Sequence, residues 1–245
     1  MNSLEKIQQE NKLGKLNEYL KEIVYGGNDG IVTTFAVVAG FSGANVSQND
    51  ALSLSFLTVL LFGFANLFSD ALSMALGNYL SIRAQRDVYK EIKIKESGKI
   101  QNIPEKEELE TVTLLKSEGF SEEDANTLTQ IYKKNPNYWL NWMMNNEYEM
   151  VDTTNINPAY TALATFLAFI TFGAIPLIPF ILLKENTDVA FSYSILGVVV
   201  ALVMLGLLKW KVIKTGLVRS VLEILVIGGT AASVAYLVGL AFQGV

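Results

Sequence analysis

Five long apolar runs are the feature of this sequence that most restricts its fold. They cover residues 23–44, 51–82, 158–183, 189–208 and 217–242. A helix needs about 20 apolar residues to cross the roughly 30 Å of hydrocarbon in a bilayer. Each run meets that length, and 51% of the 245 residues are hydrophobic, which is too concentrated in runs for one soluble core. We therefore predict an all-α integral membrane protein with five transmembrane helices.

The stretch between the second and third runs has a different composition. Residues 83–155 contain ten of the chain's 19 lysines and arginines and most of its acids. Pro104, Ser121 and Pro136 stand where helices typically start. These signals predict a small helical domain inserted between transmembrane helices two and three. The predicted organisation is an N-terminal amphipathic helix (1–21), two transmembrane helices (22–82), the inserted domain (83–155) and three transmembrane helices (156–245).

The basic residues predict which side of the membrane each part faces. They gather before the first run, in residues 83–155 and in the loop 209–219, whereas the loops after the first and third runs contain only Lys184. Segments rich in lysine and arginine stay in the cytoplasm. We therefore expect a multi-pass protein whose N-terminus and inserted domain are cytoplasmic and whose C-terminus is outside. The N-terminal residues lack the apolar core of a signal peptide, which is compatible with the prokaryotic cell (inner) membrane that we expect.

The residues that the chain lacks limit its chemistry. It has no cysteine and no histidine, which excludes thiol catalysis and the commonest zinc and copper ligands. Any metal must be held by carboxylate, amide, carbonyl or thioether groups. The net charge of −5 disfavours nucleic acid and favours cations as partners. We expect no enzyme activity and no bound cofactor, with divalent metal ions, protons and membrane lipid as partners.

Two aspartates lie inside the apolar runs, Asp29 in the first and Asp70 in the second. An ionised carboxylate at the centre of a bilayer costs about 2.5 kcal/mol or more, so intramembrane acids are usually functional. Asn66, Asp70 and Met74 are spaced i, i+4 and i+8 and therefore share one helix face. Oxygen ligands together with a thioether sulfur favour Fe²⁺ or Mn²⁺. On spacing alone, Met74 is more often a packing residue and Asn66 a contact between helices.

Four motifs in order along the chain are similar to one family. They are NDGIVTTFAVVAGFSGA, SMALGNYLS, WMMNNE and GAIPLIPF. They resemble the vacuolar iron transporter family, which also includes bacterial and archaeal iron or manganese exporters, the branch that we expect here. The resemblance implies five transmembrane helices with a cytoplasmic metal-binding domain. It also implies a homodimer with the translocation path between its subunits, and export of Fe²⁺ from the cytosol in exchange for protons.

The resemblance also implies roles for individual residues. In the membrane, the matching positions are Glu22, Asp29 and Met74. In the inserted domain, the matching metal ligands are Glu96, Glu107, Glu110, Met143, Met144 and Glu147. On spacing alone, Glu107 and Glu110 would more often form a solvated helix face. The two methionines would more often be core or dimer contacts.

Several positions depart from the family pattern. Asn66 stands where the eukaryotic members have a glutamate, and Asp70 follows one turn later. Lys99 stands where a further glutamate of the domain is expected. Extra residues between Asp29 and Asn66 predict a longer outer loop or an earlier start of the second helix. These departures leave open the number of metals in the domain and the residue that carries the proton.

Two other functions remain beside transport. A membrane-anchored protein that sequesters or oxidises iron would carry paired E-x-x-H motifs, and the chain has no histidine. A helical scaffold would dimerise through the glycines of the first run, where Gly26 and Gly30 have the small-xxx-small spacing. The transport hypothesis is that domain carboxylates collect a divalent ion and pass it to Asp29, Asp70 and Met74. Protonation of an aspartate then releases the ion.

Overall fold

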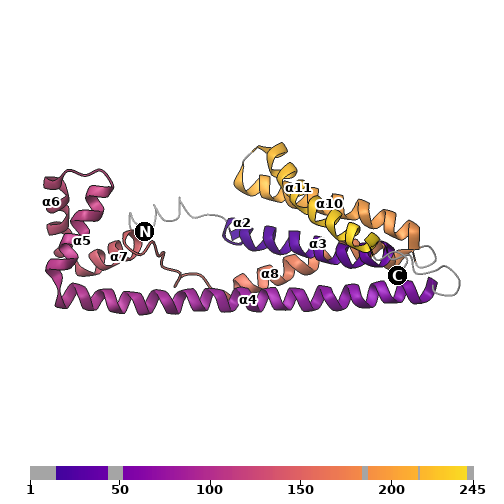
Figure 1. The fold of residues 1–245 in the computed structure, drawn as a ribbon, viewed down its shortest axis with the longest axis horizontal. Coiled ribbons are helices and arrows are strands. Elements are labelled where there is room, and N and C mark those ends of the chain that lie inside the picture. Colours follow the sequence, from indigo (N-terminus) through magenta and orange to yellow (C-terminus); the bar gives the residue numbers. More distant parts are fainter. Residues whose placement is uncertain (1–14, 44–51, 184–186, 215, 242–245) are drawn as a thin grey trace, which may run out of the picture. The chain divides into compact units, whose positions relative to one another are not determined.

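The computed structural model describes residues 15–43, 52–183, 187–214 and 216–241. All regular elements in these ranges are helices (Figure 1). In chain order they are α2 (Lys15–Glu18), α3 (Leu20–Gly43), α4 (Leu52–Asn102), α5 (Pro104–Ser117), α6 (Glu122–Lys133), α7 (Pro136–Asn146), α8 (Pro158–Gly173), η1 (Ile175–Leu177), α9 (Ile178–Leu182), α10 (Thr187–Ile213) and α11 (Leu217–Ala241). The predicted all-α class is confirmed for these ranges. Most of the helix predicted over 1–21, and the predicted outer loop, lie outside them.

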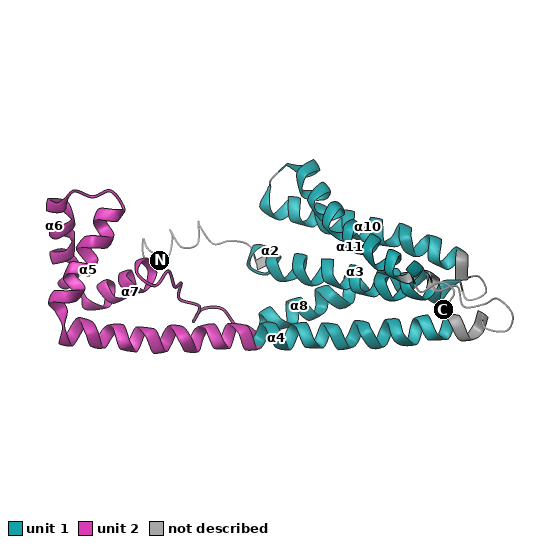
Figure 2. Ribbon diagram, viewed as in Figure 1, with its two compact units in different colours: residues 1–79, 159–245 teal, residues 80–158 magenta. Residues whose placement is uncertain are grey.

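The chain divides into two compact units, which Figure 2 shows in different colours. Unit 1 consists of residues 1–79 and 159–245, and unit 2 of residues 80–158. The segment predicted as an inserted domain, 83–155, lies within unit 2. α4 contributes to both units because it continues without interruption. Its apolar part ends near Ile82, and Arg83 begins its charged part.

α3 is central to unit 1, because both apolar clusters of that unit contain residues from it. The first cluster joins α3 to α10 and α11, and its buried members are Ile31, Phe35, Ala39, Val198, Ala201, Leu202, Leu205, Ile224 and Ala232. The second joins α3 to α4, α8, η1, α9 and α10, and its buried members are Val38, Phe56, Val59, Leu67, Ala71, Phe169, Leu177, Phe180 and Ala190. The helix that carries Asp29 is therefore held by packed side chains on two sides.

Glycines allow α3 and α8 to pack with their backbones in contact. A Cβ atom at Gly30 would lie 2.5 Å from the carbonyl oxygen of Phe169, and one at Gly26 would lie 2.9 Å from that of Thr165. Small residues at this spacing let two helices approach closely. The partner of the predicted glycine motif is thus a helix of the same chain. A scaffold that dimerises through these two glycines is therefore disfavoured.

The third apolar run is interrupted at its prolines. α8 ends at Gly173, Pro176 lies in η1 and Pro179 lies in α9. Proline has no backbone N–H and its ring clashes with the preceding turn, so a regular helix does not continue through it. The Pro176 carbonyl accepts a hydrogen bond from Ser194 Oγ of α10 (2.7 Å). In hydrocarbon, a carbonyl that is left without its helical partner where the regular helix is interrupted needs another hydrogen-bond donor.

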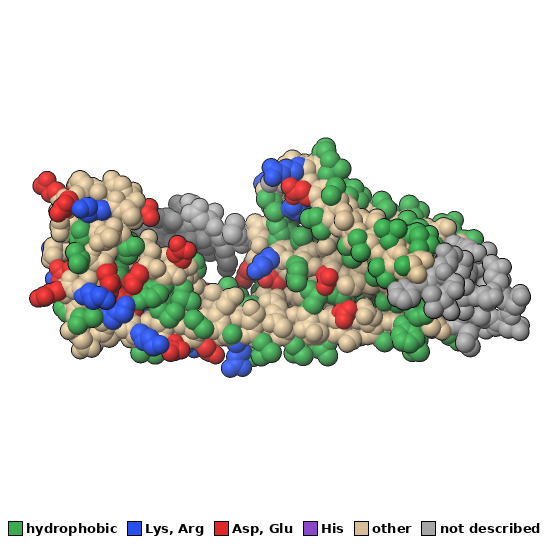
Figure 3. All heavy atoms as spheres, viewed as in Figure 1, with side chains coloured by type: hydrophobic (Ala, Val, Ile, Leu, Met, Phe, Trp, Pro, Cys, Tyr) green, Lys and Arg blue, Asp and Glu red, His purple; other side chains and the backbone are tan. Residues whose placement is uncertain are grey.

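Four helical stretches in the described chain are long and apolar enough to cross a membrane. They are Phe56–Asn102, Pro158–Leu182, Val189–Ile213 and Leu217–Val238. α3 is not among them, and it carries Asn28 and Asp29 in its N-terminal half. Hydrophobic side chains and few charged ones are visible on unit 1, whereas charged side chains gather over unit 2 (Figure 3). The protein is therefore a multi-pass membrane protein.

Three helix starts in unit 2 lie where the sequence predicts them. Pro104 and Pro136 are the first residues of α5 and α7. Ser121 caps α6 by accepting a hydrogen bond from the Asp124 backbone N–H (3.1 Å). These helices and the end of α4 enclose an apolar core whose buried members are Tyr89, Ile100, Trp139, Leu140, Met143 and Met144. Acidic side chains from the same helices meet beside this core.

Candidate metal centre

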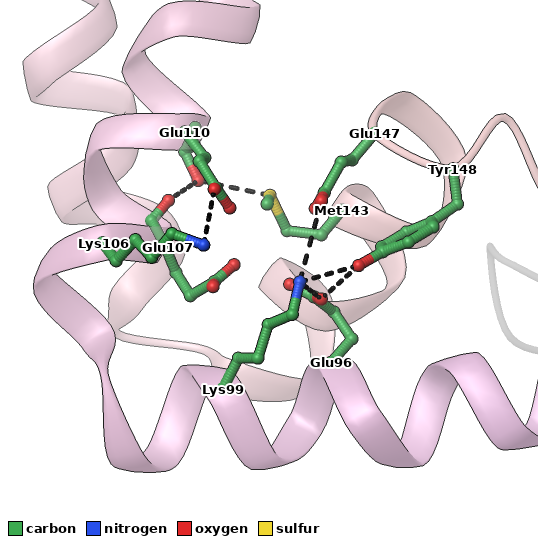
Figure 4. A network of polar contacts seen from close by, with 9 residues as sticks. Glu96, Lys99, Lys106, Glu107, Glu110, Met143, Glu147 and Tyr148 are labelled. Atoms are coloured by element: carbon green, nitrogen blue, oxygen red, sulfur yellow. Dashed lines mark hydrogen bonds and ion pairs between the residues drawn. The ribbon is translucent and has the colours of Figure 1, made fainter.

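Three glutamates from three helices of unit 2 converge, as Figure 4 shows. Glu96 lies near the end of α4, Glu107 lies in the first turn of α5, and Glu147 is the C-cap of α7. One carboxylate oxygen from each lies within 4.8 Å of the others. Glu96 and Glu107 are 0% exposed, and Glu147 is partly buried. Because negative charges so close together repel where water is excluded, the cluster needs protons or cations to balance it.

When its glutamates are all ionised, several buried carboxylate oxygens of this cluster accept no hydrogen bond from the described residues. They are both oxygens of Glu107, Glu96 Oε1, Glu110 Oε2 and Glu147 Oε2. A buried acceptor without a donor is destabilising by about 1–3 kcal/mol, and a charged one by more. Oxygens of this kind are the ligands that hard and borderline divalent cations prefer. The cluster therefore has the groups and the surroundings of a cation site.

The closeness of the carboxylates changes their affinity for protons. Burial and the neighbouring Glu96 carboxylate raise the pKa of Glu107 to about 8. Burial and the charge of Glu96 also raise the pKa of Glu147. In the metal-free chain near neutral pH, Glu107 therefore holds a proton for most of the time. A divalent ion that binds there would displace this proton.

Glu110 lies one turn after Glu107 on α5, at the edge of the cluster. Its side chain is 33% exposed, and its Oε1 pairs with Lys106 Nζ (3.2 Å). Its other oxygen is buried. The solvated-face interpretation is therefore wrong for Glu107, which is completely buried, and only partly right for Glu110.

Met143 lies among these carboxylates in Figure 4 and is fully buried. Its Sδ is 3.3 Å from Thr111 Oγ1. The same hydroxyl donates to the Glu107 carbonyl (2.7 Å) and accepts from Trp139 Nε1 (2.8 Å). These contacts connect α5 and α7 and hold the thioether beside the acids. Met144, equally buried, belongs to the apolar core of unit 2.

A lysine lies among the acids. Lys99 Nζ is 2.9 Å from Glu96 Oε2 and 3.8 Å from Glu147 Oε1. It also donates to Tyr148 Oη (2.8 Å), whose hydroxyl donates to Glu96 Oε2 (2.8 Å). Sequence reasoning identified Lys99 only as a departure from a family pattern. It missed Tyr148, because a tyrosine next to Glu147 carries no spacing signal.

The residues predicted for the membrane all lie in unit 1. Asn66, Asp70 and Met74 are on α4 and are partly buried, and Asn66 Nδ2 donates to Asp70 Oδ2 (2.8 Å). Asp29, on α3, is also partly buried. Within the described ranges, neither aspartate forms an ion pair with lysine or arginine. The two acids therefore have no fixed countercharge from those ranges.

Two further acids of unit 1 differ from this pair. Glu223 of α11 is bound by Arg219 Nε (2.9 Å) and by Lys209 Nζ (2.6 Å). The i,i+4 spacing predicts the first partner, whereas Lys209 comes from α10 and sequence reasoning missed it. Glu22 lies in the first turn of α3, and its buried Oε2 has no hydrogen-bond donor in the described chain.

The chain matches the VIT family over residues 20–240. It is 34% identical over 243 residues to the vacuolar iron transporter of Toxoplasma gondii, a match that covers 96% of this chain and 78% of that protein. The vacuolar iron transporter of Plasmodium falciparum is 30% identical, covering 98% of this chain and 88% of that protein. Vacuolar iron transporter 1 of Arabidopsis thaliana is 29% identical, and the match covers 89% of this chain and 84% of that protein. On this similarity along nearly its whole length, the chain belongs to the VIT family.

Proposed function

We propose that this protein exports a divalent transition-metal ion, Fe²⁺ or Mn²⁺, from the cytosol in exchange for protons. The observation that carries the proposal is the buried, donor-free carboxylate of Glu107 beside Glu96 and Glu147. Oxygen ligands with the nearby Met143 sulfur favour these two ions over Mg²⁺ and Ca²⁺. The names of the relatives, vacuolar iron transporters, support iron as the cargo.

The proposed transport has two stages, one in each unit. The cluster in unit 2 binds the ion and replaces part of its hydration shell with carboxylate oxygens. The ion then passes to a membrane site built from Asp29, Asp70 and Met74, with Asn66 orienting Asp70 through its hydrogen bond. Protonation of an aspartate weakens that site and releases the ion. Since a carboxylate cannot hold a proton and a metal ion on the same lone pairs, the two flows are coupled.

The proposal includes a topology and an assembly. α3 acts as the first of five transmembrane helices, despite the polar residues in its N-terminal half. The N-terminus and unit 2 face the cytoplasm and the C-terminus faces outside, which the distribution of basic residues supports. The chain acts as a homodimer in a prokaryotic cell membrane, in the bacterial or archaeal branch of the family. The support for this branch is Asn66, which stands where the eukaryotic members carry glutamate.

Transport by the reconstituted full-length protein tests the proposal. Liposomes with an inwardly or outwardly directed pH gradient are loaded with a fluorescent metal indicator, and Fe²⁺ or Mn²⁺ flux is followed. We expect Asp29→Asn and Asp70→Asn each to reduce the metal flux roughly tenfold or more. Loss of a residue that only hydrogen-bonds to a metal ligand already weakens a metal site by about this factor, and loss of the ligand itself should weaken it at least as much. Glu223→Gln is the matched control, because Lys209 and Arg219 already neutralise this acid.

The outcomes separate the three functions. Normal flux in both aspartate variants contradicts the transport scheme and agrees with a helical scaffold. Absence of flux in the wild type, with iron retained or oxidised at unit 2, indicates a sequestering or oxidising protein. Flux that does not respond to the pH gradient contradicts proton exchange but leaves metal transport in place.

A further inference from the structure

Two of the three central glutamates have one oxygen occupied by Lys99 and the other without a donor. Glu96 contacts the ammonium through Oε2, and Glu147 through Oε1. When the glutamates are ionised, Glu96 Oε1 and Glu147 Oε2 are buried and accept no hydrogen bond from the described residues, whereas the Glu107 proton of the metal-free chain is shared with Glu96. The third glutamate, Glu107, has no donor at either oxygen. Glu96 and Glu147 therefore each have one oxygen in contact with the Lys99 ammonium and one oxygen that could bind a second cation.

The ammonium of Lys99 is well held at this position. Its contacts are Glu96 Oε2 (2.9 Å), Tyr148 Oη (2.8 Å) and, more weakly, Glu147 Oε1 (3.8 Å). The ammonium also lies 5.5 Å from the centre of the Tyr148 ring, which is within the range of a cation–π contact. The side chain is only 32% exposed. A positive charge held here repels any second cation that binds to the same carboxylates.

We propose that Lys99 is an internal cation that shares Glu96 and Glu147 with the transported ion and thereby lowers the affinity of the cluster for it. This inference rests on the proposed function, since it concerns the same site. The ammonium balances part of the charge of the acids, and the divalent ion binds to Glu107 and the remaining oxygens. Weaker binding at this first site favours transfer of the ion onward. Lys99 is thus the residue that sets the affinity of the cluster.

Calorimetric titration with Mn²⁺ tests this inference. The detergent-solubilised full chain carries Asp29→Asn and Asp70→Asn throughout, so that the proposed membrane site does not contribute to the binding measured. Lys99→Gln keeps a hydrogen-bond donor near Glu96 and removes the charge, so we expect the dissociation constant for Mn²⁺ to fall about tenfold. Lys99→Arg keeps the charge, so we expect its dissociation constant for Mn²⁺ to equal that of the chain with Lys99. Lys133→Gln is the matched control, because Lys133 is 35% exposed and pairs with Glu108 in the same unit.

Whether Mn²⁺ binding becomes tighter or weaker on substitution of Lys99 distinguishes this inference from a purely structural role. If Lys99 only supported the fold, Lys99→Gln would weaken Mn²⁺ binding. A change smaller than about threefold, or weaker binding, overturns the inference. If Lys99→Gln does not fold, Lys99→Glu provides the same test, since it replaces the cation with a further carboxylate ligand and must tighten binding.

One further variant separates failure of the inference from failure of the proposed function. Glu107→Gln removes the donor-free carboxylate, and we expect it to eliminate the Mn²⁺ binding that Lys99→Gln tightens. If Glu107→Gln leaves Mn²⁺ binding unchanged, the metal site itself is wrong, and both proposals fail together. If Glu107→Gln eliminates binding while Lys99→Gln has no effect, only the inference about Lys99 fails.

Discussion

Glu107 is the residue at which the proposed metal binding and the stability of the fold have opposite requirements. Its side chain is 0% exposed. Its pKa is raised from an ordinary value of 4.5 to about 8, first by burial and then by Glu96. The folded metal-free chain therefore keeps a proton that the unfolded chain releases. For a raised pKa, the contribution to stability is complete below pH 4.5 and is lost as the pH rises through 8. The raised pKa of Glu147 acts in the same direction.

Glu107→Gln should therefore stabilise the metal-free protein increasingly as the pH rises. The amide stays neutral, so it avoids the repulsion that ionised Glu107 has with Glu96. We expect the thermal midpoint of the variant in chelator to exceed that of the wild type by a few degrees at about pH 8 and by much less at about pH 5. Glu105→Gln, an exposed position on the same helix, should show no such trend. If the thermal midpoints of Glu107→Gln and wild type differed by the same amount at pH 5 and pH 8, the raised pKa assigned to Glu107 would be wrong.

At the scale of elements, α3 is the helix on which unit 1 depends. It carries Asp29, contributes to both apolar clusters and has backbone contact with α8. The contact requires glycine at two positions, because a Cβ atom would meet the carbonyl oxygens of α8. Close packing of this kind fixes the distance between the helix that carries Asp29 and its neighbours. A change at this contact should therefore affect the whole unit.

Gly30→Ala should destabilise unit 1, and Gly40→Ala on the same helix should not. The new Cβ at Gly30 would lie 2.5 Å from the Phe169 carbonyl oxygen, whereas one at Gly40 would meet nothing within 4 Å among the described residues. Overpacking of this kind typically costs about 1–3 kcal/mol, and alanine in an open helical position is neutral or favourable by up to about 1 kcal/mol. Thermal unfolding in detergent measures both variants. Equal midpoints would mean that α3 and α8 do not pack as described.

At the scale of the whole molecule, the chain combines an apolar unit with a charged one. Unit 1 exposes large apolar side chains such as Leu61 (69%) and Val226 (64%), as helices that face lipid do. Unit 2 has a small core of its own and the acidic cluster beside it. The number of membrane crossings determines which compartment the acidic cluster faces. This number depends on whether α3, which is not among the four candidate spans of the described chain, also crosses the membrane.

Single cysteines introduced into this cysteine-free chain measure that number. If α3 crosses the membrane, Glu18→Cys before it and Ser117→Cys in unit 2 should both resist a membrane-impermeant maleimide in intact cells, while Gly244→Cys reacts. Both described positions are exposed, so protection would come from the membrane and not from packing. Permeabilised cells provide the control, since all three variants should then react. Labelling of Glu18→Cys in intact cells, with Ser117→Cys protected, would mean that α3 does not cross.

Much of the fold follows from local sequence patterns. The helix starts at Pro104, Ser121 and Pro136 lie where the sequence predicts them, because helix capping and the fixed backbone angle of proline act within a few residues. The long apolar runs likewise predict helices, since hydropathy is a local sum. The absence of histidine and cysteine by itself limits the candidate ligands to oxygen and thioether groups.

The family resemblance implied Glu96, Glu107 and Glu147 as ligands, but only the tertiary structure decided how these side chains are arranged. Spacing along α5 could not show that Glu107 is buried while Glu110 is at the edge, because that depends on α4 and α7 packing against it. The approach of Glu96 to Glu147, 51 positions apart in sequence, depends on where the helices of unit 2 turn back. The position of Lys99 between them depends on the same turns. Local chemistry determines which helices form and which groups can bind a cation, and packing determines which of those groups meet.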